Sequence, residues 1–366
     1  DHRDLHSFPT PRSSDLGNDV ELLDNGQLLA SLGVENPVFS FGGFGGIVQI
    51  INPDSSVEWE YILANEEHLI HHDVEMLPNG NILAIVWDLR LPEELEAIGY
   101  LGDEERVYTE SILEINPATN ETVWKWDSWD HIVQDVDDTK PYFGIVDEHP
   151  EKININYIDV LRENVAPDGD IMHANGLDYD QNNDLIYLSV NQFSEVWVID
   201  HSTTIEEALI GAGGNMDKGG DLVYRFGNPR AYNNMIGDRL FFNNHFPNIL
   251  KDGLPGSGNI LVYANGNDDA KQSVVYEFDL PTEFNLQSNE NNEPEIVWQY
   301  TRDNLYSAKV SGALRLSNGN TLVTSGSIGV IEVTNEKEVV WEFVGTGFYW
   351  RSYHYDLDSD AITFLK

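Results

Sequence analysis

One hairpin pattern recurs five times along this chain of 366 residues. Each copy has an apolar-alternating strand, a turn built on Asn-Gly or a similar pair, and a second strand. The copies cover residues 20–32, 74–87, 177–190, 248–263 and 313–326. Asn-Gly between alternating strands indicates a β-hairpin, because a type I′ turn needs positive φ at both central residues. The pattern therefore predicts an all-β fold built from repeated units.

A second hairpin follows most copies of the first and ends in Val-Trp or Val-x-Trp. It covers residues 47–61, 112–126, 275–300 and 330–343, while in the third copy 196–200 leads through a long insert to 221–227. Two hairpins make a four-stranded unit, which at this spacing is typical of a propeller blade. We expect one tryptophan per unit to pack between blades: Trp59, Trp124, Trp298 and Trp341.

We predict a six-bladed β-propeller of four-stranded antiparallel blades. Residues 350–366 are interpreted as the opening hairpin of the sixth blade, and the seam is expected to be incomplete at the N-terminus. A stack of unrelated β-sandwiches is the alternative, which is disfavoured because the units repeat in the same order without linkers. Only two short helices are expected, in 92–99 and 206–210.

Residues 1–16 read DHRDLHSFPTPRSSDL and share no pattern with the rest of the chain. The stretch resembles a translated sequencing adapter and has no apolar core of a signal peptide. We interpret it as a non-native, disordered segment, a natural disordered terminus being the alternative. The prediction is a single propeller domain over 17–366, whose own N-terminus and any export signal are missing.

Charge restricts the possible partners. The chain has 63 acidic and 20 basic side chains and a formal net charge of −43. Nucleic acid and anionic membranes are therefore not expected as partners, because both require a basic surface. Cysteine is absent, which excludes disulfides, thiolate metal ligands and a cysteine nucleophile. No apolar run is long enough to cross a membrane as a helix.

Polar residues recur where the first strand of each unit begins, and in a propeller these strands line the central channel. Three units place histidine there. The positions are His71 and His72 in the second unit, His173 and Asn175 in the third, His245 in the fourth and Ser311 in the fifth. A single histidine at a strand start is usually a hydrogen-bonding residue, but three at equivalent positions indicate a shared site.

Three histidines could bind zinc, but strands on separate blades do not readily bring their ligands within about 2.1 Å of one point. We therefore predict no metal and no cofactor. The alternative is a reaction of an anionic substrate, in which one imidazole is the nucleophile and neighbouring imidazolium groups stabilise the negative charge on the substrate's oxygen atoms. We expect the acidic surroundings to raise the pKa of these histidines.

These residues resemble the aryl-sulfate sulfotransferase family. The similarity runs through nearly all of 17–366, and its most specific blocks are 71–83, 129–135, 173–180, 188–204, 219–232, 240–266 and 311–323. The resemblance implies a six-bladed propeller that is periplasmic or secreted. It also implies nucleotide-independent transfer of a sulfuryl group from an aryl sulfate to a phenol, through a transient sulfohistidine.

By motif, the resemblance assigns His245 as the nucleophile and His173 and His72 as catalytic residues. It assigns Asn175, His71, Asn191 and Ser311 to substrate binding. Asn191 is a departure, because better-known members have an arginine at the aligned position. The candidates that could compensate are Arg90, Arg230 and Arg351. Phe246-Pro247 after the proposed nucleophile is a second departure.

Two other functions remain open at this stage. One is a weakly active or inactive propeller that binds a phenolic or sulfated ligand or a protein partner, which Asn191 favours. The other is a sulfatase-like hydrolase, which the absence of cysteine disfavours. The sequence leaves the donor, the acceptor and the oligomeric state open, a homodimer included.

Overall fold

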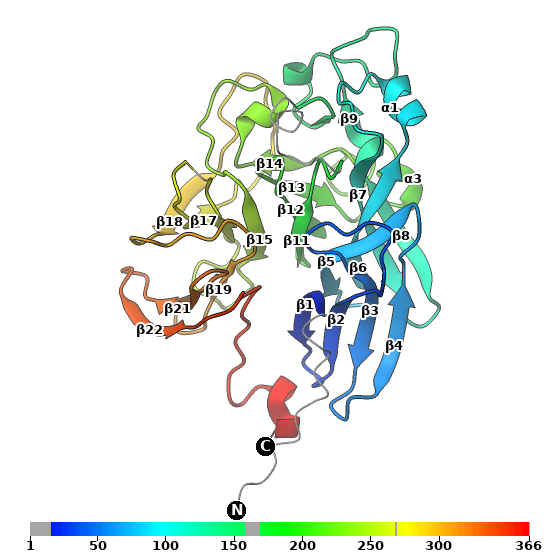
Figure 1. Cartoon of the computed structure of the whole chain (residues 1–366). Helices are drawn as coiled ribbons and strands as arrows, with labels where there is room; N and C mark the ends of the chain where they lie inside the picture. The colour runs from blue at the N-terminus through cyan, green and yellow to red at the C-terminus, as the bar shows by residue number, and fades with distance from the viewer. Residues whose placement is uncertain (1–15, 158–168, 268, 366) are drawn as a thin grey trace, which may run out of the picture.

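The computed structural model describes residues 16–157, 169–267 and 269–365. Five four-stranded antiparallel sheets follow one another along the chain, and in each sheet the strand order is the sequence order. Figure 1 shows the five sheets arranged as blades around a centre, with the first strand of each blade innermost. The five units read from the sequence are confirmed, and the chain folds as an all-β propeller.

The strands of the first three blades, from the channel to the rim, are as follows. Blade 1 has β1 (Leu16–Leu22), β2 (Leu28–Gly33), β3 (Gly46–Ile51) and β4 (Val57–Ile62). Blade 2 has β5 (His68–Met76), β6 (Ile82–Arg90), β7 (Val107–Asn116) and β8 (Glu121–Asp127). Blade 3 has β11 (Ala174–Asp180), β12 (Leu185–Val190), β13 (Glu195–Asp200) and β14 (Tyr224–Phe226).

Two further blades complete the series. Blade 4 has β15 (Asn244–Ile249), β16 (Ile260–Ala264), β17 (Val274–Asp279) and β18 (Glu295–Tyr300). Blade 5 has β19 (Gly312–Arg315), β20 (Thr321–Ser325), β21 (Gly329–Val333) and β22 (Val339–Val344). A short parallel pair, β9 (Ile132–Val133) and β10 (Ile153–Asn154), lies outside the blades.

Helix is scarce, as the sequence predicts. The described α-helices are α1 (Pro92–Ile98), within the expected segment 92–99, and α3 (Ile205–Ala208), which overlaps the expected segment 206–210. Four 3-10 turns complete the described helical structure: η1 (Ser128–His131), η2 (Val146–Glu148), η3 (Pro229–Tyr232) and η4 (Asp360–Leu365). None of the described helices is long and apolar enough to cross a membrane.

The prediction of six blades is wrong, because the structure has five. Residues 350–359 form no strand, and η4 follows them. The alternating aromatic residues of this segment suggest a strand, but its side chains are bonded to blade 1 instead of to a new hairpin. Tyr353 donates to Asp19 at 2.9 Å, and the Tyr355 hydroxyl accepts the Leu22 amide at 3.0 Å.

This C-terminal segment runs between the last blade and the first (red in Figure 1). At its start the Ser311 amide donates to the Trp350 carbonyl at 3.1 Å. At its end Phe364 lies against Gly26 in the turn of blade 1. The segment therefore bridges blades 5 and 1. Residues 1–15 lie outside the described residues, and the proposed domain boundary at 16/17 stays a prediction.

The core consists of apolar clusters between neighbouring blades. Trp124 and Trp298 are buried there, 4% and 8% exposed, and Trp59 packs against the cluster that joins blades 1 and 2. These three tryptophans confirm the expected packing between blades. Trp341 does not, because half of its surface is exposed on the outer strand of blade 5.

Candidate active site

The inner strands of blades 2, 3 and 4 each contain a β-bulge. The register shifts fall between His71 and Val74, between Ala174 and Gly176, and between His245 and Asn248. Beside each bulge one residue has positive φ: His72 (54°), His173 (52°) and Phe246 (50°). Such backbone is costly for residues other than glycine, and bulges commonly redirect side chains beside active sites. The three predicted histidine positions therefore share one unusual local structure.

The structure brings the histidines of blades 2 and 3 together. The rings of His72 and His173 lie 4.6 Å apart, centroid to centroid. Nδ1 of His71 is 2.7 Å from Nδ1 of His72, and the ring of His71 stacks on Trp87 at 3.7 Å. His71 and His72 are 0% and 2% exposed. A pair of buried imidazoles thus lies against a third, more accessible one.

His245 is 5% exposed, and both of its ring nitrogens have partners. Nδ1 is 2.6 Å from Oδ1 of Asn265, whose Nδ2 donates to the carbonyls of Ser307 and Val310. Because that amide is fixed by its own donors, Nδ1 of His245 carries the proton and donates. Its lone pair is on Nε2, which accepts the Val310 amide at 3.1 Å.

His173 is held by a carboxylate. Its Nδ1 is hydrogen-bonded to Oδ2 of Asp170, and Oδ1 of the same residue accepts the His173 amide at 3.1 Å. The hydrogen bond to the carboxylate fixes the orientation of the ring and directs Nε2 away from Asp170. About 20% of the His173 side chain is exposed, so it is the most accessible of the four cluster histidines.

The expectation that acidic surroundings raise the histidine pKa values is wrong for three of the four. The pKa of His245 is lowered to about 3, mainly by burial and to a smaller extent by the positive charges of His173 and Arg351. Burial also holds the pKa values of His71 and His72 well below the usual 6.5. The desolvation of a buried imidazolium outweighs the distant negative charge of the surface. His245 is therefore neutral at pH 7, as a nucleophile must be.

Two predicted substrate-binding residues act on the backbone next to His245. Asn175 and Asn191 both donate from Nδ2 to the Asn244 carbonyl, at 2.8 and 3.2 Å, and Ser189 donates to the same oxygen at 3.2 Å. Three donors on one carbonyl fix the strand that carries the nucleophile candidate. Oδ1 of Asn175 is buried without a partner in the described residues, which leaves one acceptor open for a donor.

Of the three arginines considered as substitutes for the arginine absent at position 191, only Arg351 lies at the cluster. Its guanidinium donates to both oxygens of Asp73 at 2.9 and 2.8 Å and lies 4.3 Å above the Phe246 ring. Arg90 instead pairs with Asp127 at 2.8 Å, and Arg230 donates to backbone carbonyls of its own loop.

Ser311 contributes less directly than predicted. Its hydroxyl accepts the Gly326 amide at 2.9 Å, and the residue is 1% exposed. The contact from blade 5 to His245 is made by the backbone of the preceding residue, Val310. Val310 has φ of 51°, which is strained for a β-branched residue.

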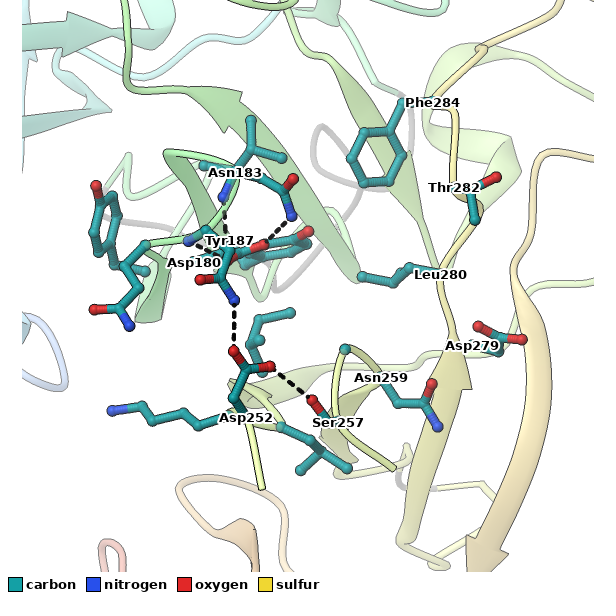
Figure 2. Close-up of a pocket in the computed structure, with 18 of the residues that line it drawn as sticks. Asp180, Asn183, Tyr187, Asp252, Ser257, Asn259, Asp279, Leu280, Thr282 and Phe284 are labelled. Atoms are coloured by element: carbon teal, nitrogen blue, oxygen red, sulfur yellow. Dashed lines mark hydrogen bonds between the residues drawn. The ribbon is translucent and has the colours of Figure 1, made fainter. Parts of the chain in front are cut away.

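Figure 2 shows a cavity of about 530 Å³ elsewhere in the molecule. It is lined by Tyr187, Phe284, Asp252 and the turn that contains Asp180. Asp252 accepts from Asn182 at 3.4 Å and from Ser257 at 3.0 Å. Asp180 ends β11, so this turn lies about 20 Å along the strand from His173. The cavity is therefore separate from the histidine cluster.

Sequence reasoning missed the side chains that orient the histidines: Asp170, Asn265 and Glu110. Asp170 lies three residues before His173, a spacing that could have indicated it. Glu110 lies in a strand that contains a second glutamate, Glu114, so the sequence marks it less clearly. Among the described residues no group of three or more His, Asp or Glu is arranged to hold a metal ion.

The fold and the site define a β-propeller with a cluster of buried histidines at its central channel. The chain belongs to the arylsulfotransferase (ASST) family, whose model matches residues 54–359. That range contains every histidine of the cluster. No curated protein sequence matches the chain significantly.

Solved structures with a similar arrangement include three proteins. The β-propeller domain of Cps50 (Swd1) from Myceliophteria thermophila has 11% sequence identity and a TM-score of 0.44, with 91% of this chain and 88% of that one covered. The WD40 domain of coronin from Toxoplasma gondii has 10% identity and a TM-score of 0.38, with 92% of this chain and 73% of that one covered. A putative 6-phosphogluconolactonase from Bacteroides fragilis has 10% identity and a TM-score of 0.42, with 91% of this chain and 71% of that one covered. At these TM-scores the likenesses support no argument about function.

Proposed function

We propose that this protein transfers a sulfuryl group from an aryl sulfate ester to a phenolic acceptor by way of a sulfohistidine on His245. Family membership supports the reaction class. The observation that carries the residue assignment is the state of His245: a neutral imidazole whose Nδ1 proton is held by Asn265 and whose lone pair is on Nε2. No nucleotide and no metal takes part in this scheme.

The remaining groups fit the charge that develops in such a transfer. By analogy with phosphoryl transfer, sulfuryl transfer has a loose transition state with negative charge on the peripheral oxygens. His173, hydrogen-bonded through Nδ1 to Asp170, lies beside His72. Arg351 adds a buried guanidinium whose charge lowers the pKa of both His72 and His245. Preorganised charge of this kind stabilises transferring anions.

Access to His245 requires one local change. Its Nε2 lone pair accepts the Val310 amide, so attack on sulfur breaks that hydrogen bond. The strained φ angles of Val310 (51°) and Ser311 (90°) favour this movement, because the backbone gains by leaving them. An aryl sulfate that displaces Val310 from Nε2 would place its sulfur in line with the lone pair.

The test is turnover of 4-nitrophenyl sulfate with and without phenol. We expect nitrophenol release that depends on phenol and falls by at least about a thousandfold in His245→Ala. His149→Ala is the matched control, because His149 is a half-exposed histidine outside the cluster. Unchanged release in His245→Ala would exclude the assignment of His245. Release without phenol would instead indicate a hydrolase.

Absence of turnover together with binding of the aryl sulfate would favour the alternative of an inactive ligand-binding propeller. Asn191 favours that alternative, since it is uncharged and its Nδ2 is already bonded to Asn244. Location in the periplasm or outside the cell remains part of the proposal, resting on the family resemblance alone.

A further inference from the structure

Three buried groups, of which two are histidines of the cluster, form a continuous hydrogen-bonded chain. Oε2 of Glu110, on β7, is 2.9 Å from Nε2 of His71, and Nδ1 of His71 is 2.7 Å from Nδ1 of His72. Glu110 and His71 are 0% exposed. Both ring nitrogens of His71 are used, so His71 connects the other two and does not itself reach a ligand.

The geometry of this chain is fixed from several sides. The His71 ring lies parallel to Trp87, with an interplanar angle of 1°. Oε1 of Glu110 accepts the Ala174 amide at 2.8 Å, which ties the carboxyl to the inner strand of blade 3. Because Oε1 is engaged in this way, an acid proton on Glu110 belongs on Oε2, where it faces His71.

Burial favours the uncharged form of all three groups. It raises the pKa of Glu110 well above its usual value, and the nearby carboxylates of Asp170 and Asp88 raise it further. It lowers the pKa values of His71 and His72, and the positive charge of His173 adds to both effects. The titratable groups that face His72 beyond this chain are His173, His245 and Arg351.

A neutral chain has only one arrangement of protons that satisfies both hydrogen bonds. Glu110 donates from Oε2 to Nε2 of His71, and His71 donates from Nδ1 to Nδ1 of His72. The remaining proton of His72 is then on Nε2, beside Gly43, where a Cβ would collide with the imidazole ring. In the resting state the hydrogen-bonded chain therefore ends in an N–H group at Nε2 of His72.

We propose that Glu110 and His71 form a proton relay that makes His72 the acid in the first half of the reaction and the base in the second. This inference rests on the proposed function. Glu110 and His71 are positioning residues in this scheme, because they act through His72, whose ring lies against His173.

In the first half the S–O bond to the aryl group breaks as the N–S bond to His245 forms. The aryl oxygen takes the Nε2 proton of His72. The Nδ1 proton of His71 moves to Nδ1 of His72, and the Oε2 proton of Glu110 moves to Nε2 of His71. The phenol leaves neutral, and the chain ends as a Glu110 carboxylate with a free lone pair on Nε2 of His72.

In the second half the acceptor phenol gives its proton to that lone pair as its oxygen attacks sulfur and the N–S bond breaks. The two protons of the relay move back, from Nδ1 of His72 to Nδ1 of His71 and from Nε2 of His71 to Oε2 of Glu110, and Glu110 becomes a neutral acid again. The acceptor's proton replaces the one that left with the first phenol. Proton transfer along the chain in one direction thus serves the first half of the reaction, and transfer in the other direction serves the second. The enzyme gains or loses no proton over the full cycle.

The experiment compares Glu110→Gln with wild type on two donors. The Gln amide can accept from Ala174 and donate to His71, so it preserves the hydrogen bonds but cannot release a proton. With phenyl sulfate, whose phenolate is a poor leaving group, we expect kcat to fall on the order of a hundredfold. With 4-nitrophenyl sulfate, the first burst of nitrophenol should stay within about threefold of wild type, because that leaving group needs little acid assistance.

The pH profile gives a second readout that a purely structural role would not move. With phenol as acceptor, the slow second half in Glu110→Gln should recover as the pH approaches about 10, where phenol ionises without a base. Glu114→Gln is the matched control: the same strand, the same substitution and again a glutamate paired with a histidine, His201, at 3.1 Å. Equal losses on both donors, or losses no larger than those of Glu114→Gln, would overturn the relay.

The resting proton arrangement can be measured without turnover or mutation. Nitrogen-15 chemical shifts of labelled histidines in wild type should show His71 protonated on Nδ1 and His72 protonated on Nε2. His71 protonated on Nε2 would mean an ionised Glu110 and would contradict the proposal. If wild type releases no nitrophenol at all, the proposed function fails, and these shifts decide the relay separately.

Discussion

Each histidine of the cluster has one neighbour that decides which ring nitrogen carries its proton. Asn265 does this for His245, Asp170 for His173 and, through His71, Glu110 for His72. A nucleophilic imidazole must present a lone pair, whereas an anion-binding one must present an N–H. Identical side chains at equivalent positions of three blades are thus given different chemistry by the partner that each blade supplies.

Asn265 allows a direct test at this scale. In Asn265→Ala the Nδ1 proton of His245 loses its acceptor, so the lone pair is no longer restricted to Nε2. We expect kcat for 4-nitrophenyl sulfate to fall on the order of tenfold to a hundredfold, by analogy with side chains that orient metal-bound histidines. The measurement is the burst rate of nitrophenol together with KM, which should change little.

Asn292→Ala is the control for that experiment. Asn292 is also a buried asparagine with several hydrogen bonds, but its partners are Tyr232 and Gln287, away from the cluster. Activity lost equally in both variants would show that the effect is general destabilisation and not orientation of His245.

Among the elements, the outer strands connect neighbouring blades in a repeated way. The indole N–H of Trp59 donates to Asn120 at 2.6 Å, that of Trp124 to Thr203 at 3.0 Å, and that of Trp298 to the Asn335 carbonyl at 2.8 Å. In each case the acceptor lies in or beside the outer hairpin of the next blade. Trp341 holds the same place in blade 5 but is half exposed.

Trp298 and Trp341 should differ in their contribution to the stability of the folded protein. Trp298→Ala removes a buried indole and its hydrogen bond, and we expect the free energy of unfolding to fall by about 3 kcal/mol or more. Trp341→Ala should cost well under about 1 kcal/mol, because its side chain is half exposed. Urea unfolding followed by circular dichroism measures both. A large loss for Trp341→Ala would mean that blade 5 has a neighbour in solution.

The sequence predicts the five units because hairpin turns and strand alternation are local signals. It does not predict the number of blades. Residues 350–355 alternate like a strand, but only tertiary contacts decide that Arg351 and Tyr353 bond to Asp73 and Asp19. The same limit applies to the site: the histidine positions follow from the repeat, whereas Asn265 and Glu110 come from other strands. Their roles depend on pairing across 20 and 39 residues.

For the whole molecule, two kinds of negative charge oppose folding in different ways. The surface carries most of the formal net charge of −43, and its repulsion is screened by salt. A few carboxyls are instead buried. Burial raises the pKa of Asp19 and that of Glu293 to about 8, and Oε1 of Glu293 has no partner among the described residues. Salt does not screen these groups effectively.

Stability should therefore fall as pH rises from 6.5 to 8. In this window Asp19 and Glu293 keep their protons in the folded protein but not in the unfolded chain, where their pKa values are near 3.8 and 4.5. The folded state binds more protons, so each group lowers the free energy of unfolding by up to about 1.4 kcal/mol per pH unit. His245 adds a smaller slope of the opposite sign that fades above about pH 7.5, because its pKa in the unfolded chain is near 6.5 and only the unfolded state holds its proton there.

Salt separates the two contributions. Urea midpoints at pH 6.5 and 8, each measured in about 0.01 M and about 1 M NaCl, should rise with salt at both pH values, because the Debye length falls from about 30 Å to about 3 Å. The decrease between pH 6.5 and 8 should persist in 1 M NaCl. Glu293→Gln cannot ionise, so its decrease should be smaller than that of wild type at both salt concentrations. A decrease that disappears in 1 M NaCl, or that is the same in Glu293→Gln, would assign the pH dependence to surface repulsion alone.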